Sequence, residues 1–202
     1  MTATIDKQSR ALDERALNIL FHEARSHKGF LPEPVPADLL ERIVDTTEIG
    51  PTSMNTLPLR VVFVTSEAGR ERLKSLVMPG NVAKVESAPV IAILARDLNF
   101  HEKMPRLIPQ APQEYIDHAR EQADALSLQN ATLQAGYFML AARAHGLDVG
   151  PLGGFDSAGV DAAFFQDGTT KSILLVMLGY GDESKLYPRG PRLAFDEIAS
   201  FA

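Results

Sequence analysis

Hydrophobic residues recur along this chain with two different periods, and these periods separate predicted helices from predicted strands. Apolar residues at helical spacing predict helices over Asp13–Arg25 and Ala37–Glu48. Runs rich in β-branched and aliphatic residues predict strands at Leu59–Val64, at Pro89–Leu94 and within Lys171–Tyr180. The last two runs are almost continuously apolar, which is typical of strands buried in the centre of a sheet.

Shorter periodic stretches between these elements predict further helices. Glu67–Val77 and Val160–Phe165 each have helical spacing, and a short helix that carries Asn81 and Lys84 precedes the strand at Pro89. Residues 99–112 are the least periodic part of the chain and contain three prolines. We interpret them as an active-site flap.

The longest periodic stretch, Tyr115–His145, predicts one long helix or two abutting ones. Its second half, Ala131–Ala144, is apolar or small on nearly every side. A helix without a polar face must be buried all round. In a chain of this length, a subunit interface is a natural place for such a helix.

Long helices combined with a few buried strands predict an α+β fold, in which a sheet is flanked by helices. The length of 202 residues suits one domain with a sizeable core, which we place at residues 13–202. Residues 1–12 are expected to form a flexible N-terminal arm.

Composition narrows the class of protein. A formal net charge of -6 argues against a nucleic-acid-binding protein. The chain has no cysteine, which excludes disulfides, thiolate catalysis and cysteine-based metal sites, and its five histidines lack metal-ligand spacing, so no metal is predicted. No apolar run approaches the roughly 18 residues that span a bilayer. The N-terminus has no apolar signal core, so we expect a cytoplasmic protein without a membrane partner.

The segment with the most informative chemistry is Gly50–Asn55, which follows a predicted helix and precedes a predicted strand. Thr52 and Ser53 offer hydroxyl groups, and Asn55 offers a side-chain donor and acceptor. Such a loop can hold a flat ring with heteroatoms at its edge without supplying any charge. The same residues are also ordinary chemistry for ending a helix, so both interpretations stay open for the loop alone.

Three other segments offer chemistry that suits the same kind of ligand. Arg25–Lys28 and Arg189–Arg192 combine guanidinium groups with other donors, which suits a phosphate. The glycines of Gly150–Asp156 permit close approach of the backbone to a ligand. Taken singly, the basic segments also fit solvated turns or helix ends, and the glycine segment also fits a tight turn.

The chain lacks the motifs of serine hydrolases, of P-loop nucleotide-binding proteins and of Rossmann domains. From about Leu17 to the C-terminus it resembles instead the nitroreductase family of FMN-dependent oxidoreductases, which has motifs like these in the same order and spacing. The resemblance implies a nitroreductase-like fold with a central, mostly antiparallel sheet. It also implies an intertwined homodimer with two FMN sites at its interface.

The resemblance further implies which residues bind the cofactor. Arg25–His27 matches a phosphate-binding motif, and Asn81 and Lys84 match a pair at the pyrimidine and ribityl side of the flavin. A segment at the N5 edge of the flavin is matched by Pro151, Gly154, Phe155 and Asp156. The loop at Pro51 matches one that reaches the flavin bound mainly by the partner subunit. The full set of predicted FMN-binding residues is Arg25, Ser26, His27, Pro51, Thr52, Ser53, Asn55, Asn81, Lys84, Pro151, Leu152, Gly153, Gly154, Arg189 and Arg192. No obligatory catalytic side chain is predicted.

Within the family the chain looks most like the branch of malonic semialdehyde reductases, on the stretches Glu23–Phe30, Gly154–Asp156, Asp161–Phe165 and Leu178–Asp182. This implies ping-pong hydride transfer from NADH or NADPH, which docks transiently, to malonic semialdehyde, giving 3-hydroxypropionate. Many nitroreductases carry Glu where this chain has Gly153, and the missing carboxylate suits an anionic substrate. A broad-specificity nitroreductase or quinone reductase and a non-catalytic flavin-binding protein are the alternative functions.

Overall fold

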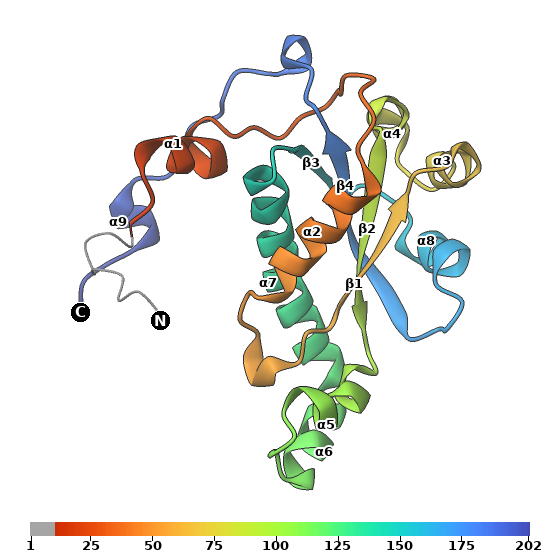
Figure 1. The fold of residues 1–202 in the computed structure, drawn as a ribbon, viewed down its shortest axis with the longest axis vertical. Coiled ribbons are helices and arrows are strands. Elements are labelled where there is room, and N and C mark those ends of the chain that lie inside the picture. Colours follow the sequence, from red (N-terminus) through yellow and green to blue (C-terminus); the bar gives the residue numbers. More distant parts are fainter. Residues whose placement is uncertain (1–10) are drawn as a thin grey trace.

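Four antiparallel strands form the centre of the protein, and helices cover both faces of the sheet (Figure 1). The computed structural model describes residues 11–202, so the arm predicted for residues 1–12 lies outside the described residues except for its last two. The strand order is β1-β2-β4-β3, with β1 (Leu59–Val64), β2 (Val90–Asp97), β3 (Asp148–Leu152) and β4 (Thr170–Gly179). The predicted α+β fold, a central antiparallel sheet flanked by helices, is confirmed.

The central strands send alternate side chains to the two faces of the sheet. Val90, Ala92 and Leu94 of β2 pack on one face, whereas Ile91 and Ile93 pack on the other, and all five are buried. Both faces therefore need a layer of helices. This requirement explains why the predicted central strands are apolar at every position.

Two long helices cover the first face of the sheet. α2 (Ala37–Glu48) packs on α7 (Ala123–Ala144), and α7 runs along the strands (Figure 1). α6 (Gln113–Glu121) precedes α7, and the two are separated by Gln122. The predicted long stretch therefore forms two abutting helices. Among residues 11–202, no helix is both long enough and apolar enough to cross a membrane.

Part of the α7 surface is not covered by this chain. Phe138 is fully buried against the sheet, where its ring centre lies 6.2 Å from that of Phe63. In contrast, Leu128 and Leu133 are 46% and 45% exposed. This chain alone therefore does not cover the whole helix, and burial of Ala131–Ala144 at a subunit interface stays a prediction.

Shorter helices cover the second face: α3 (Glu67–Lys74), α4 (Val82–Ser87) and α8 (Ser157–Phe164). The predicted helix that begins at Glu67 ends three residues early, since Val77 instead forms an isolated bridge with Phe155. This bridge brings the turn after α3 against the segment that follows β3. It positions one half of the candidate site described below.

β3 is a strand that sequence patterning does not predict. Gly150 and Pro151 both lower strand propensity, so the segment has the composition of a turn. Pro151 is tolerated because β3 is an edge strand, paired in the sheet with β4 only. Part of the predicted ligand-binding segment is therefore fixed to the sheet.

The predicted flap is helical rather than irregular. Residues Phe100–Lys103 form a 3₁₀ turn, and α5 (Met104–Leu107) follows it. Phe100 and Met104 are fully buried in a small core of their own with α6, and Met54 packs against this core. The flap and the loop around Met54 thus form one packed unit.

Both ends of the described chain are only lightly packed. The predicted helix at Asp13–Arg25 is shorter in the structure, where α1 (Glu14–Leu17) continues as a π-helical turn to His22. α9 (Phe195–Ile198) lies near the C-terminus (Figure 1). Large apolar side chains of the last ten residues are between 60% and 93% exposed, namely Leu193, Phe195, Ile198 and Phe201.

Asp97 joins β2, β1 and the flap through two ion pairs. Its Oδ2 lies 2.5 Å from Arg60 Nη2 and 2.8 Å from Lys103 Nζ. Burial acts to raise the pKa of this carboxyl, but the hydrogen bond from Lys103 and the charge of Arg60 outweigh it and leave the pKa below its usual value. Because the folded-state pKa is lowered, ionised Asp97 stabilises the fold fully at pH values above its unfolded pKa of about 3.9. This stabilisation is lost as the pH falls through the folded-state pKa.

We expect Asp97→Asn to lower the free energy of unfolding at neutral pH by roughly 1–3 kcal/mol. The variant should also lose less stability than the wild type when the pH falls below about 4. Urea denaturation across this pH range measures both effects, with Asp45→Asn on the exposed surface of α2 as the matched control. An unchanged pH dependence in Asp97→Asn would contradict the assignment.

Candidate functional site

Two basic segments that are far apart in the sequence line one cleft of about 410 Å³. Arg25, Ser26 and Lys28 contribute from the first segment, and Arg189 and Arg192 contribute from the second. In the part of the chain that the structure describes, no acidic residue lines this cleft. The protein as a whole carries a net charge of -6, so the cleft is a local concentration of positive charge suited to an anion such as phosphate.

Hydrogen bonds to backbone carbonyl groups hold the two segments together. Arg189 Nη2 donates to the carbonyl oxygen of Ala24 at 3.0 Å, and the Arg25 guanidinium donates to that of Tyr187. The Lys28 ammonium lies 3.5 Å from the centre of the Tyr187 ring, a cation–π contact. These cations are therefore held in defined positions rather than freely solvated.

Arg143 of α7 also lines the cleft, and sequence reasoning missed it. Its Nη1 donates to the carbonyl oxygen of Leu20 at 2.9 Å. Burial lowers the pKa of the Arg143 guanidinium below its usual value, the charge of Asp148 opposes this, and the positive charge of Arg189 lowers it further. The available signal was a single cation within the otherwise uncharged segment Ala131–Ala144.

His27 is buried beside the cleft and does not line it. The residue is 6% exposed, its Nε2 lies 3.3 Å from Asp148 Oδ1, and its Nδ1 has no hydrogen-bond partner among the described residues. A Cβ on Gly181 would lie 2.0 Å from Nδ1, so only glycine fits against this ring. The backbone N of His27 donates to the carbonyl oxygen of Val149 at 3.0 Å. His27 is thus placed to attach its segment to β3.

A second cluster of predicted residues lies just after the end of β3. Asn81 Nδ2 donates to the carbonyl oxygen of Gly154 at 3.0 Å, and Asn81 Oδ1 accepts a hydrogen bond from Lys84 Nζ at 2.7 Å. The backbone N of Met78 donates to the same Gly154 oxygen at 3.0 Å. The structure therefore joins two motifs that are separate in the sequence.

The two adjacent glycines of this cluster have different surroundings. A Cβ on Gly154 would lie 2.7 Å from Asn81 Nδ2 and 3.1 Å from Met78 Sδ, so a side chain at this position would displace the Asn81 amide from its hydrogen bonds. Gly153 is exposed, and a Cβ there would meet no atom within 4 Å. Close packing requires glycine at position 154 but not at position 153.

β3 connects the cleft with the Asn81 cluster. Ser26 forms a parallel bridge with Val149 near the start of the strand, and Gly154 lies in the loop after its end. Between them Pro151 is exposed and Leu152 is buried in the core. At about 3.3 Å per residue, the five steps from Val149 to Gly154 span at most roughly 16 Å. An elongated ligand with a phosphate at one end and a polar ring at the other fits this arrangement.

The loop at residues 51–57 has a strained backbone. Met54, Asn55 and Leu57 have φ angles of 56°, 49° and 42°, in the left-handed region that non-glycine residues rarely adopt. Thr52 Oγ1 accepts a hydrogen bond from Leu57 N at 3.3 Å, and Asn55 Nδ2 donates to the carbonyl oxygen of Leu107 at 3.2 Å. Strain of this kind is often kept where a loop serves a function.

The same loop is tied to α7. Ser53 N donates to Asn130 Oδ1 at 2.7 Å, and the Tyr137 hydroxyl donates to the carbonyl oxygen of Pro51 at 3.1 Å. Within residues 11–202, no hydrogen bond joins this loop to the basic cleft or to the Asn81 cluster. In one chain, the five predicted motifs therefore form two separate groups: four motifs lie along β3, and the loop at residues 51–57 lies apart from them.

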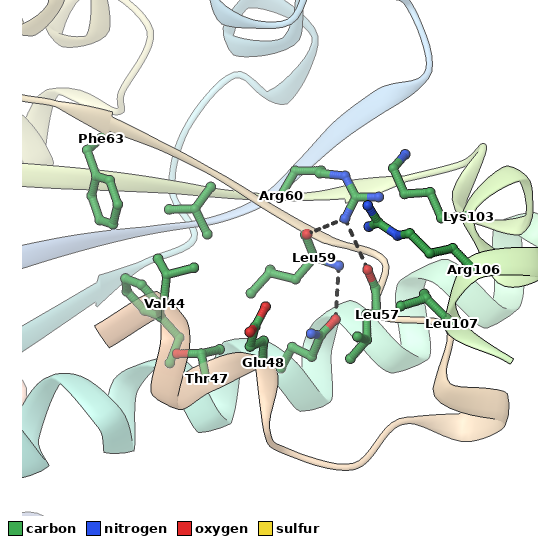
Figure 2. Close-up of a pocket in the computed structure, with 13 residues that line it drawn as sticks. Val44, Thr47, Glu48, Leu57, Leu59, Arg60, Phe63, Lys103, Arg106 and Leu107 are labelled. Atoms are coloured by element: carbon green, nitrogen blue, oxygen red, sulfur yellow. Dashed lines mark hydrogen bonds between the residues drawn. The ribbon is translucent and has the colours of Figure 1, made fainter. Parts of the chain in front are cut away.

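A further cavity of about 340 Å³ lies between β1, α2, α7 and α5 (Figure 2). Its wall is mainly apolar, and Arg60 at one end donates to the carbonyl oxygens of Leu57 and Leu59 at 3.0 Å and 2.7 Å. Arg106 extends from α5 toward the same end, and it forms no ion pair with the described residues. None of the predicted FMN-binding residues lines this cavity.

Comparison with known proteins decides the family. The sequence model of the nitroreductase family matches residues 22–180. The chain belongs to the nitroreductase family. Two relatives are named as candidate NADH dehydrogenases/NAD(P)H nitroreductases. The one from Stenotrophomonas maltophilia is 48% identical over 195 residues, which cover 96% of this chain and 100% of the relative. The one from Leptothrix cholodnii is 49% identical over 191 residues, which cover 93% of this chain and 96% of the relative.

Solved structures of nitroreductase-type proteins have the same fold. YdfN from Bacillus subtilis superimposes with a TM-score of 0.82 at 21% identity, covering 94% of this chain and 100% of that one. A protein from Exiguobacterium sibiricum, solved in complex with FMN, gives a TM-score of 0.79 at 22% identity. The match covers 95% of this chain and 98% of that one. The nitroreductase-like fold expected from the sequence is thereby confirmed.

The unequal room at the two glycines gives a direct test of the Asn81 cluster. We expect Gly154→Ala to lower the free energy of unfolding by roughly 1–3 kcal/mol, because the new methyl group collides with the Asn81 amide. Gly153→Ala should change it by no more than about 0.5 kcal/mol. Urea denaturation without added flavin measures both, and equal stability of the two variants would contradict the described packing.

Proposed function

We propose that this nitroreductase-family protein is an FMN-dependent oxidoreductase that uses NADH or NADPH to reduce malonic semialdehyde. The observation that carries the cofactor assignment is the pair of clusters at the two ends of β3. The basic cleft suits the phosphate of FMN, and the cluster of Asn81, Lys84 and Gly154 suits the polar edge of its ring. Bound FMN would supply hydride transfer, while the protein supplies binding, orientation and charge.

The charge of the cleft and the open backbone after β3 support FMN as the ligand. Arg25, Arg189 and Arg192 can share one phosphate, with Ser26 as a further donor and no acidic residue in the lining of the cleft. Gly153 is exposed and a Cβ there would meet no atom within 4 Å, so the backbone at this point is open to the close approach of a ring. A dinucleotide such as FAD would need a site for a second phosphate and an adenine, and no dinucleotide motif is present in the sequence.

We expect the purified protein to release FMN on denaturation, identified by mass. Arg25→Ala should raise the dissociation constant for FMN by about tenfold to a hundredfold, because it removes a charge-assisted hydrogen bond worth roughly 1.5–3 kcal/mol. Arg42→Ala, on the exposed side of α2, is the control and should leave the affinity unchanged. Recovery of FAD, or failure to bind FMN on reconstitution, would refute the cofactor assignment.

A homodimer would bring the separate motif groups together. The loop with Ser53 and Asn55 makes its contacts with α7 and the flap of its own chain, away from the cleft. Leu128 and Leu133 of α7 and the apolar C-terminal residues are exposed in one chain, which marks them as a surface for another copy. In the proposed dimer, this loop reaches the flavin held mainly by the partner subunit.

Light scattering should therefore give about twice the chain mass of 22.0 kDa, with FMN bound. Leu133→Asp should weaken the dimer, because a carboxylate then replaces an apolar side chain in the proposed interface, and FMN should be lost together with the dimer. A stable monomer that retains FMN would contradict a site shared between chains.

Two features support an anionic acceptor. Gly153 leaves the proposed N5 edge without a carboxylate, so an acidic substrate meets no like charge there. Arg106 has no ion-pair partner among the described residues, and the next residue, Leu107, accepts a hydrogen bond from Asn55. We assign Arg106 as a candidate partner for the carboxylate of the acceptor. In the reaction, the aldehyde carbon gains hydride and its oxygen gains a proton, giving 3-hydroxypropionate and NAD(P)⁺.

Gly153→Glu tests this choice of acceptor. The new side chain has room, since a Cβ would meet no atom within 4 Å. We expect kcat/KM for malonic semialdehyde to fall at least fivefold relative to a neutral aldehyde of similar size, because like charges at close range repel by about 1 kcal/mol or more. The neutral, equally large Gly153→Gln should show no such discrimination. Equal losses of kcat/KM in both variants would show that the size of the new side chain, and not its charge, causes the effect.

A broad-specificity nitroreductase or quinone reductase is the second candidate function, favoured by the names of the relatives. The two functions predict different rankings of the acceptors by kcat/KM. If a quinone or a nitroarene exceeds malonic semialdehyde in kcat/KM by orders of magnitude, this second function is correct. Bound flavin without steady NAD(P)H turnover would instead indicate a flavin-binding protein.

A further inference from the structure

Met78 presents a large apolar side chain to solvent beside the loop that follows β3. It is 62% exposed, although the preceding Val77 is buried in the core. The backbone of Met78 is held on both sides, because its N donates to the Gly154 carbonyl oxygen at 3.0 Å and its carbonyl oxygen accepts from Asn81 N at 2.8 Å. The exposure of Met78 is therefore a fixed feature of this turn and does not come from a loose chain end.

The thioether of Met78 lies against the backbone of Gly154. A Cβ on Gly154 would lie 3.1 Å from Met78 Sδ and 3.6 Å from Met78 Cγ. The neighbouring Gly153 is exposed, and a Cβ there would meet no atom within 4 Å. A flat ring that approaches the open backbone at Gly153 would therefore have this sulfur at its edge.

Met78 differs from the other methionines in the part of the chain that the structure describes. Met104 and Met177 are 0% and 1% exposed, and Met54 and Met139 are only partly exposed. A methionine is oxidised most readily where the oxidant can reach its sulfur. Among residues 11–202, Met78 is therefore the methionine most open to an oxidant.

We propose that Met78 is an oxidation site beside the bound flavin, and that its conversion to methionine sulfoxide weakens the binding of FMN. The inference rests on the proposed FMN site. A thioether makes favourable contacts with aromatic rings, whereas a sulfoxide is polar and disrupts apolar contacts. Oxidation of Met78 would replace an apolar contact at the edge of the ring by a polar, hydrated group.

The oxidant can arise at the same site when molecular oxygen is the only acceptor. Oxygen takes two electrons and two protons from the flavin that NAD(P)H has reduced, and it becomes hydrogen peroxide. The O–O bond of the peroxide then breaks. One oxygen atom binds to Met78 Sδ, which is oxidised by two electrons, and the other oxygen atom leaves as water. The protein would thereby lose affinity for FMN when it turns over without an organic acceptor.

The first experiment treats the FMN-loaded protein with hydrogen peroxide and maps the oxidation by mass. Trypsin places Met78 on the peptide of residues 75–84, which contains no other methionine. This peptide should gain one oxygen atom at least about tenfold faster than the peptides that carry Met104 or Met177. Turnover in air with NADH alone should oxidise the same peptide, whereas the same incubation without oxygen should not.

The second experiment measures the dissociation constant of FMN by fluorescence titration before and after peroxide treatment. The constant of the wild type should rise by about threefold to tenfold, and methionine sulfoxide reductase should restore it. Met78→Leu keeps an apolar side chain of similar size, so its constant should be the same before and after peroxide. Met139→Leu on α7 is the matched control and should respond to peroxide as the wild type does.

Three results would overturn the proposal. If another of the described methionines is oxidised before Met78, the assigned site is wrong. An unchanged dissociation constant after complete oxidation of Met78 would show that the sulfoxide does not affect the cofactor. An equal rise in Met78→Leu would show that peroxide acts elsewhere. If Met78→Leu does not fold, repair of the oxidised wild type decides, and failure of the reductase to restore the constant contradicts the proposal.

Titration of the untreated wild type with FMN separates two kinds of failure. If the wild type does not bind FMN, the proposed function is wrong, and the role of Met78 is wrong with it. If the wild type binds FMN but oxidation of Met78 leaves the dissociation constant unchanged, only the role of Met78 is wrong.

Discussion

The pairing of β3 with β4 is the constraint on which the candidate site depends. β4 is fixed in the core by packing on both faces, so the edge strand β3 is fixed as well. Ser26 attaches to β3 at Val149, and Gly154 follows where the strand ends. Both clusters are thereby placed along one line by backbone hydrogen bonds, and mobile side chains do not decide the distance between them.

Charge is distributed along this line in a way that suits a phosphorylated ring. The cleft gathers several guanidinium groups without an acidic residue in its lining, in a protein of net negative charge. Mutual repulsion among these cations is relieved when an anion binds, so the site favours a phosphate over a neutral group. At the other end, Lys84 would be the charge beside the ring in the proposed site, and it is held by the neutral amide of Asn81, which in turn bonds Gly154.

Local sequence chemistry predicts much of this structure, and long-range contacts account for what it misses. Helix α2 and strand β1 have the predicted bounds, because their apolar spacing matches the face that they bury. β3 escapes prediction because Pro151 is tolerated only at an edge, and the position of a strand in a sheet is not a local property. The resemblance to the family implies the Asn81–Lys84 pair, whose members lie within one turn, whereas Arg143 joins the cleft through the packing of α7. His27 has a side chain suited to phosphate, but the fold buries it against Asp148.

The central claim is that each FMN site combines the basic cleft of one chain with the loop of another, and subunit complementation tests it most directly. Arg25→Ala damages the cleft and Asn55→Ala damages the loop, so each variant alone should bind FMN weakly. In a mixed dimer with a shared site, one site carries both changes and the other carries neither. Mixing the two unfolded variants and refolding them together should therefore restore tight binding to about one site per mixed dimer. No recovery of tight FMN binding, although mixed dimers form, would contradict the account.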